Sequence, residues 1–327
     1  MMHAYDVIGD VHGYGQKLDG LLDLLGWVEG DDGQRRNPDP NRQVVFVGDL
    51  IDRGEHQKAV LQTVRAMTDA GTAQIVMGNH EFNAIAYGTQ HPEKPNEFLR
   101  EHSDKNVKQH QAFLNAFPDG DERAGWIEWF RTLPLWLDLG PLRIVHACWH
   151  QPSIDLLETK LGGNFFPENP DLFIKAIDKS DPIGNAIEVI LKGPEMQLAP
   201  YGLPQFYDKG STLRDAARVR WWNKDATQIA DLIDLPSDVI AEDGNRYPTI
   251  ENIPCSDIDR SFAYTDVIPV LYGHHWRQWE PEEHLDWTSN TACVDFSAGN
   301  GGPLVAYQWS GETTINKNHF VNYPGNS

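Results

Sequence analysis

Cysteine is scarce in this sequence of 327 residues. The three cysteines are widely spaced and form no Cys-x-x-Cys pair; they are Cys148, Cys255 and Cys293. An odd number of isolated cysteines argues against a framework of disulfide bonds. The simplest compartment for such a chain is a reducing cytoplasm, which is where we expect the protein to be located.

Long apolar runs and positive charge are also in short supply. No apolar run approaches the roughly 18 residues of a membrane span, and the first expected strand begins near residue 3, so no secretory signal fits there. The chain has 27 Lys and Arg against 48 Asp and Glu, a formal net charge of −21. This balance disfavours general nucleic-acid binding and anionic membranes as partners. It does not exclude an anionic substrate, because bound metal ions can dominate the local field.

Three short polar blocks each follow an apolar, strand-like run. The blocks read Gly9-Asp10-Val11-His12-Gly13, Gly48-Asp49-Leu50-Ile51-Asp52-Arg53-Gly54 and Gly78-Asn79-His80-Glu81. A lone Gly-Asp-x-His-Gly is also what an ordinary turn provides, but three blocks in order at strand–helix spacing favour a site. Because ligands of open α/β sheets bind beyond the carboxyl ends of strands, we expect the blocks on one rim. His146 and His274 follow further strand-like runs.

The rest of the chain divides by composition. Strand–block–helix units repeat three times before residue 90, which is typical of a layered α/β domain. Residues 92–132 favour helices, and the later strands are expected at 135–139, 142–146, 267–272, 292–296 and 303–309. The predicted division is a core of residues 1–150 and 263–312, a cap of residues 151–262 inserted within the same domain, and a polar tail of residues 313–327 that we expect to fray.

The polar blocks offer oxygen and imidazole ligands without a thiolate, a mixture that suits Mn, Fe or Zn better than an all-oxygen Ca or Mg cage. Asp10 and His12 lie two residues apart, so both can point the same way at a strand end. They could share one metal ion, and the two oxygens of Asp49 could bridge it to a second. The ligands expected to complete the second site are Asn79, His146 and His274. Two such ions can hold a hydroxide for in-line attack on phosphorus.

Residues beside these ligands suggest catalytic roles. Arg53 suits a bidentate hold on phosphate oxygens. His80 is a candidate acid for the leaving oxygen, and Asp52 would orient it and favour its charged form. No Ser or Cys nucleophile is needed, so we expect direct attack by metal-bound hydroxide without a covalent intermediate.

The three blocks resemble those of the calcineurin-like metallophosphoesterases. Asp52-Arg53-Gly54 and Gly78-Asn79-His80-Glu81 resemble the phosphoprotein phosphatase branch, which holds serine/threonine phosphatases and bacterial diadenosine tetraphosphate hydrolases. The resemblance returns at Ile144-Val145-His146-Ala147 and at Gly273-His274. It implies an α/β fold, a layered sandwich of two mixed β-sheets flanked by helices, here with an inserted and largely helical cap. It also implies two divalent metal ions, Mn and/or Fe with Zn as an alternative, and the same residue roles as given above.

Two further assignments, of a metal ligand and of a second phosphate-binding residue, have less sequence evidence behind them. His275 follows His274 directly, and we choose His274 as the ligand on the resemblance. Residues 209–224 hold five basic side chains against one acid, and Arg220 beside Trp221 and Trp222 is our candidate for a second grip on substrate phosphate. The alternative for this segment is a solvated basic face that pairs with acidic neighbours.

These observations give competing functions. The first is hydrolysis of phosphate monoesters, on phosphoserine or phosphothreonine proteins or on small phosphate esters, which Asp52-Arg53-Gly54 and Glu81 favour. The second is hydrolysis of dinucleoside polyphosphates such as diadenosine tetraphosphate, which Gly273-His274-His275-Trp276 favours. A third, a metal-binding scaffold without turnover, is weak because every catalytic position that the resemblance implies is filled.

Overall fold

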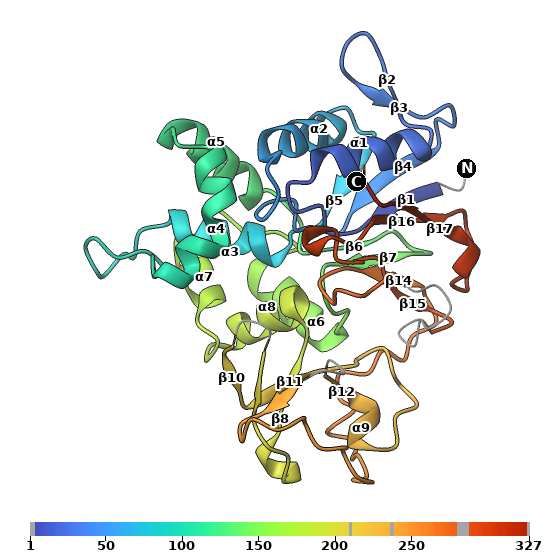
Figure 1. Ribbon diagram of the computed structural model, residues 1–327. Helices are drawn as coiled ribbons and strands as arrows, with labels where there is room; N and C mark the ends of the chain where they lie inside the picture. The colour runs from blue at the N-terminus through green and yellow to red at the C-terminus, as the bar shows by residue number, and fades with distance from the viewer. Residues whose placement is uncertain (1–3, 209–210, 236–238, 280–287, 326–327) are drawn as a thin grey trace.

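Two mixed β-sheets packed face to face form the centre of the computed structural model, which describes residues 4–208, 211–235, 239–279 and 288–325 (Figure 1). The first sheet has the spatial order β17 (Phe320–Tyr323), β16 (Leu304–Trp309), β1 (Ala4–Ile8), β4 (Arg42–Phe46) and β5 (Ala73–Ile75). The second has the order β15 (Thr291–Cys293), β14 (Val270–Tyr272), β7 (Arg143–Val145) and β6 (Trp136–Asp138). The predicted two-sheet sandwich is confirmed.

The alternation of side chains along the strands explains the layering, because successive residues of a strand point to opposite faces. In and just after β4, Val45 and Val47 belong to the core between the sheets, which also contains Ile144 and Leu271 of the second sheet. Their neighbours Val44 and Phe46 pack in the other core, against the helices. A strand that is apolar on both faces must be covered on both sides, as a central strand of a layered α/β fold is.

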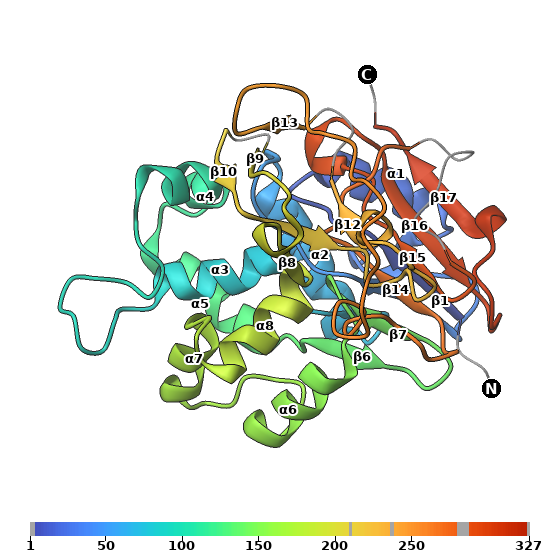
Figure 2. The same ribbon diagram turned by 90° about the horizontal axis from the view of Figure 1, so that it is seen from below.

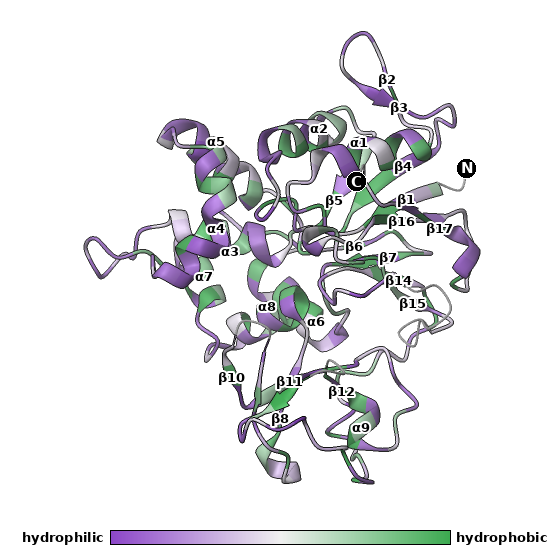
Figure 3. Ribbon diagram, viewed as in Figure 1, coloured by the Kyte–Doolittle hydropathy of each residue, from purple (hydrophilic) through white to green (hydrophobic). Residues whose placement is uncertain are grey.

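Helices cover the outer faces of this sandwich (Figure 1). The helices of the N-terminal half are α1 (Gly15–Leu24), α2 (Gln57–Asp69), α3 (Asn79–Gly88), α4 (Asp104–Ala116) and α5 (Gly120–Arg131). Leu18, Leu21 and Leu22 are buried from α1, at the spacing of one helix face. Figure 3 shows the same division, with hydrophobic colour on the central strands and on one side of the surrounding helices. The predicted helical character of residues 92–132 is confirmed by α4 and α5.

Residues 151–262 begin with three helices and continue with short strands (Figures 1 and 2). The helices are α6 (Gln151–Leu161), α7 (Pro170–Ile177) and α8 (Pro182–Lys192). Two small antiparallel sheets follow, one of β12 (Ile233–Asp234), β11 (Ala216–Val219) and β8 (Glu195–Gln197), the other of β10 (Leu213–Arg214), β9 (Phe206–Tyr207) and β13 (Ile240–Ala241), with the one-turn helix α9 (Ile229–Leu232). Helices therefore account for the first half of this insertion and strands for much of the second.

The polar tail contains ordered structure where fraying was expected. Strand β17 pairs antiparallel with β16, with Leu304 opposite Tyr323 and Tyr307 opposite Phe320. Although the tail as a whole is polar, the strand itself reads Phe320-Val321-Asn322-Tyr323, and Phe, Val and Tyr favour strands. A short hairpin of β2 (Val28–Glu29) and β3 (Arg35–Arg36) lies outside the sandwich.

Within the described residues, no helix has both the length and the apolar character that crossing a membrane requires.

Candidate active site

The three polar blocks come together because they follow neighbouring parallel strands. Strand β4 is parallel to β1 and to β5, so the loops that leave their carboxyl ends share one edge of the sheet. The backbone N–H of His12 donates to the carbonyl of Asp49 at 2.9 Å. The second sheet is joined to the same edge through His146, whose Nδ1 lies 2.7 Å from the carbonyl of Val47. Residues far apart in the sequence thus meet at one rim, as predicted.

The backbone of this rim is strained. Eight non-glycine residues of the described chain have positive φ, and five of them are His12, Asp49, Asp52, Arg53 and His274, with φ between 48° and 71°. This left-handed conformation costs a residue with a side chain about 1–3 kcal/mol, and it persists where the surrounding structure enforces it. Its concentration on predicted site residues indicates that the fold holds these side chains in directions that relaxed backbone would not give.

Two glycines of the motifs allow close approach. A Cβ atom on Gly78 would lie 2.3 Å from the amide nitrogen and from Oδ1 of Asp49. A Cβ atom on Gly273 would lie 2.1 Å from Oδ1 of Asp10. No side chain fits at such distances, so glycine at these two positions lets the carboxylates lie directly against the backbone of a neighbouring loop.

Two groups of donor atoms in the described chain could each hold a metal ion. The first contains His12, Asp49 and His80, and the second contains Asp49, His146 and His274; within each group the donor atoms lie within 4.8 Å of one another. Asp49 belongs to both, with Oδ2 3.8 Å from Nε2 of His12 and Oδ1 3.4 Å from Nε2 of His146. This is the arrangement expected of a carboxylate that bridges two ions.

The remaining predicted ligands lie at the same place. Asp10 is buried and accepts a hydrogen bond from the backbone N–H of His274 at 3.2 Å. Oδ1 of Asn79 lies 3.1 Å from Nε2 of His146. His275, the alternative to His274, is also buried, but its ring packs edge-on against Trp222 and Tyr272. The structure therefore places His274 with the other five predicted ligands.

The electrostatics of this cluster fit bound cations. Burial, with repulsion from Asp295 and Asp49, raises the pKa of Asp10 well above its usual value. Burial opposes ionisation of Asp49 as well, but His146 and His80 outweigh it and hold the pKa of Asp49 well below its ordinary value. Several buried carboxylates crowded together repel one another, and divalent cations would relieve that repulsion. The oxygen and imidazole donors suit Mn, Fe or Zn.

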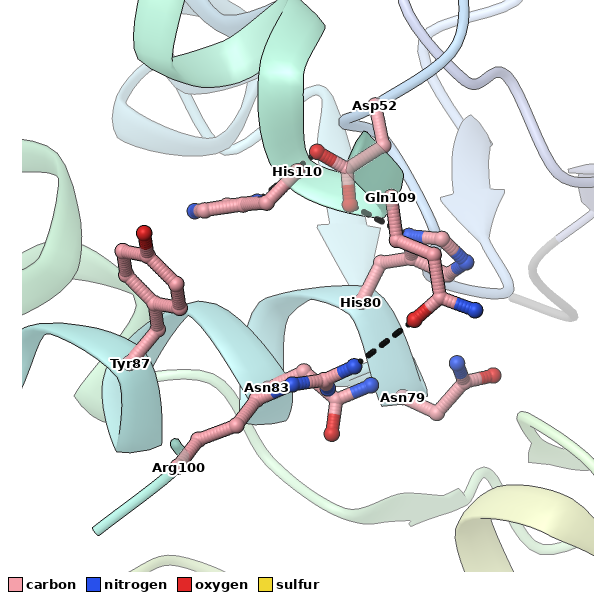
Figure 4. Close-up of a pocket in the computed structure, with 8 residues that line it drawn as sticks. All are labelled: Asp52, Asn79, His80, Asn83, Tyr87, Arg100, Gln109 and His110. Carbon is pink, nitrogen blue, oxygen red and sulfur yellow. Dashed lines mark hydrogen bonds and ion pairs between the residues drawn. The ribbon is translucent and has the colours of Figure 1, made fainter. Parts of the chain in front are cut away.

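Asp52 joins two histidines beside the cluster (Figure 4). Its Oδ2 lies 2.5 Å from Nδ1 of His80, and its Oδ1 lies 2.8 Å from Nδ1 of His110. Burial alone would lower the pKa of His80, but Asp49 and Asp52 raise it to about 9. His110, on α4, is a partner that the sequence did not reveal, since a single histidine in a helical stretch carries no signal of its own.

Glu81 ties the second and third blocks together. Its buried carboxylate accepts from the backbone N–H groups of Asp49 at 2.9 Å, Leu50 at 2.8 Å and Gly78 at 3.0 Å. Burial, with repulsion from Asp49, raises the pKa of Glu81 to about 7. The residue thus fixes the position of Asp49 relative to the start of α3 without itself belonging to either donor group.

Two arginines lie close to the candidate centre. Arg53 is exposed and forms no ion pair or side-chain hydrogen bond with any described residue. Burial, with repulsion from His80 and Arg53, lowers the pKa of His12 to about 3. Arg218, from β11 of the insertion, places Nη2 3.0 Å from Nε2 of His274. A free guanidinium and a second one within reach of the same histidine cluster can bind an anion there.

Arg220, the phosphate-binding candidate chosen from the sequence, pairs with an acidic side chain of the insertion. Its Nε lies 3.5 Å from Oδ1 of Asp234, whose Oδ2 lies 3.2 Å from Nη2 of Arg277. Arg218 lies within β11, whereas Arg220 follows the end of that strand, where the chain turns at Trp221. Spacing alone could not distinguish the two arginines, because the sequence does not show where the strand stops.

Comparisons with known proteins agree with this geometry. A family model described as calcineurin-like phosphoesterase matches residues 5–182. An asymmetrical bis(5'-nucleosyl)-tetraphosphatase, PrpE, from Halalkalibacterium halodurans is 46% identical over 76 residues, which are 23% of this chain and 30% of that protein. A symmetrical bis(5'-nucleosyl)-tetraphosphatase from Janthinobacterium sp. (strain Marseille) is 34% identical over 142 residues, which are 43% of this chain and 42% of that protein. Both alignments span less than half of the relative's length.

A solved structure of a protein serine/threonine phosphatase from Saccharomyces cerevisiae overlaps 99% of this chain and 80% of its own, at 14% identity and a TM-score of 0.47. The family model, by contrast, covers more than half of the chain and includes the three polar blocks and His146. The chain therefore belongs to the calcineurin-like phosphoesterase family.

Proposed function

We propose that this protein hydrolyses phosphate compounds by direct attack of water on phosphorus, at a two-metal centre. The single observation that carries the proposal is the place of Asp49 in both donor groups, with one oxygen toward His12 and the other toward His146. The proposed ligands are Asp10, His12, Asp49, Asn79, His146 and His274. Two divalent ions held there, Mn and/or Fe with Zn as an alternative, would supply Lewis acidity and hydroxide at neutral pH.

The other residues of the site have separate roles in this proposal. Arg53 and Arg218 bind the oxygens of the phosphoryl group and hold it in line with the attacking water. As the bond from phosphorus to the leaving oxygen breaks, His80 gives the proton on Nε2 to that oxygen. Asp52 accepts from Nδ1 of His80, so it fixes the ring and favours its protonated form. No covalent intermediate forms.

Two classes of phosphate compound are candidate substrates of the proposed enzyme. Asp52-Arg53-Gly54 and Glu81 favour phosphate monoesters, either phosphoserine and phosphothreonine proteins or small esters. The second class is dinucleoside polyphosphates, and the names of the bacterial relatives support it. We further propose that residues 151–262 form a cap within the same domain, because Arg218 of this insertion contacts His274, and that the enzyme acts in the cytoplasm.

The test is a comparison of three substrates. Purified protein loaded with Mn is assayed against a phosphopeptide, p-nitrophenyl phosphate and diadenosine tetraphosphate, with metal content measured on the same sample. We expect turnover of at least one substrate, lost on chelation and restored by Mn. Protein that retains two ions yet releases no product from any of the three, also with Fe or Zn, contradicts the proposal and supports a scaffold without turnover.

A further inference from the structure

A pocket opens beside His80 that the proposed reaction does not use (Figure 4). It has a volume of about 100 Å³ and lies between α3, which contributes Asn83 and Tyr87, and α4, which contributes Gln109. Arg100 closes it from the segment that joins these helices. Because His80 and Asp52 form one wall, the pocket adjoins the side of the centre where the leaving oxygen receives its proton.

The guanidinium of Arg100 has no acidic partner at close range. Its Nη2 donates to Oδ1 of Asn106 at 3.1 Å and to Oε1 of Gln109 at 2.9 Å, and it forms no ion pair with any described residue. Of the nearest carboxylates, both oxygens of Asp52 are already bound by histidines. The other, Glu188, contacts two lysines. An arginine has five N–H donors, so most of those on Arg100 are available to an anion.

The neutral groups around Arg100 suit the same ligand. Oε1 of Gln109 accepts from Arg100, which turns its amide nitrogen, a donor, toward His80 and Asn79 (Figure 4). Asn83 and Tyr87, whose side chains carry an amide and a hydroxyl, also line the pocket. The pocket has room for at least one tetrahedral oxyanion beside the guanidinium.

We propose that this pocket is a second phosphoryl-binding subsite, which holds a phosphoryl group on the leaving side of the reaction. The inference rests on the proposed function, because that function places the leaving oxygen at His80. In a phosphoanhydride the leaving oxygen itself carries another phosphoryl group, so one substrate would reach the metal centre and Arg100 together. A phosphate monoester has no such group. The subsite therefore selects polyphosphate substrates over monoesters.

The experiment compares two substrates in four proteins. The proteins are the wild type, R100M, R100K and the control K108M, all loaded with Mn. Lys108 is exposed on α4 and does not line the pocket, so K108M removes one positive charge without touching the subsite. The measured quantity is kcat/KM for diadenosine tetraphosphate divided by kcat/KM for p-nitrophenyl phosphate. Losing a charge-assisted hydrogen bond in R100M should lower this ratio about 10- to 100-fold. R100K should recover part of it, and K108M should match the wild type.

Other outcomes separate the subsite from the proposed function. An unchanged ratio in R100M, or an equal loss on both substrates, overturns the subsite. So does a wild type that hydrolyses p-nitrophenyl phosphate but neither hydrolyses diadenosine tetraphosphate nor is inhibited by it. If no substrate is hydrolysed at all, the proposed function fails. The subsite is then tested separately, by calorimetric titration of the protein with diadenosine tetraphosphate in EDTA. Weaker binding to R100M than to the wild type and K108M supports it, and equal binding overturns it.

Discussion

Arg218 places Nη2 of its guanidinium 3.0 Å from Nε2 of His274, although 56 residues separate them in the sequence. The arginine belongs to β11 of the insertion, and the histidine follows β14 of the second sheet. Both the burial of His274 and the charge of Arg218 lower the pKa of His274 well below its usual value. A neutral imidazole is the form that ligates a metal ion, so Arg218 of the insertion favours the ligating form of His274.

Replacing Arg218 should weaken substrate binding. R218A removes a cation that the proposal places on phosphate oxygens, so KM for p-nitrophenyl phosphate should rise about 10- to 100-fold. R220A is the matched control, because Arg220 pairs with Asp234 instead, and its KM should change by less than about twofold. Steady-state kinetics of the two variants decide between the arginines. A larger rise in KM for R220A than for R218A would instead support Arg220, the residue chosen from the sequence, as the second phosphate-binding arginine.

Removing the bridging carboxylate should cost metal and activity together. Asp49 belongs to both donor groups. In D49N one of its two carboxylate oxygens is replaced by an amide nitrogen, which cannot ligate a cation. We expect metal content, measured by elemental analysis, to fall together with turnover. D69N is the control, because Asp69 is exposed and pairs with Arg65 on α2. Full metal content in D49N would contradict the bridging role.

Replacing His80 should separate metal binding from catalysis. His80 lies in one of the donor groups and is also hydrogen-bonded to Asp52, so the structure allows either a ligand or a proton donor. Because the proposal makes it the proton donor, we expect H80N to keep its metal and to lose about 10²–10⁴-fold in kcat, the usual contribution of general acid catalysis. Metal loss in H80N equal to that in D49N would make His80 a ligand instead.

Adding one methyl group at Gly273 should displace the carboxylate of Asp10 and so weaken metal binding. The new Cβ would lie 2.1 Å from Oδ1 of Asp10, so the carboxylate must move. We expect G273A to bind metal more weakly, measured by titrating the chelator-treated protein with Mn. G125A on α5 is the control, since nothing lies within 4 Å of its Cβ. Alanine favours the helix at that position, so G125A should keep its metal affinity and gain up to about 1 kcal/mol of stability.

The meeting of the candidate ligands at one rim could be predicted because the signals for it are local. Asp10, His12, Asp49 and Asn79 each follow an apolar strand, and parallel strands bring their carboxyl ends to one edge. The partners that the sequence missed depend on contacts between elements. His110 approaches Asp52 only because α4 packs beside the second block, and no pattern within α4 announces it.

The same limit applies to the insertion and to the end of the chain. Whether Arg218 or Arg220 faces the centre depends on where β11 stops, which is set by its pairing with β8 and β12. Residues 320–323 are mostly strand-forming types, but whether they pair depends on the free edge that β16 presents to them. Contacts of this kind are tertiary and override local propensity.

Strand β1 lies between β4 and β16, so its two neighbours come from opposite ends of the sequence. During translation, residues 5–8 are made about 300 residues before their antiparallel partners at 306–309. At about 5–20 residues per second, the ribosome needs on the order of 15–60 s to bridge that gap. One edge of β1 stays unpaired for this time, and an open strand edge invites aggregation. Nascent or truncated chains that lack β16 should therefore depend on chaperones to remain soluble.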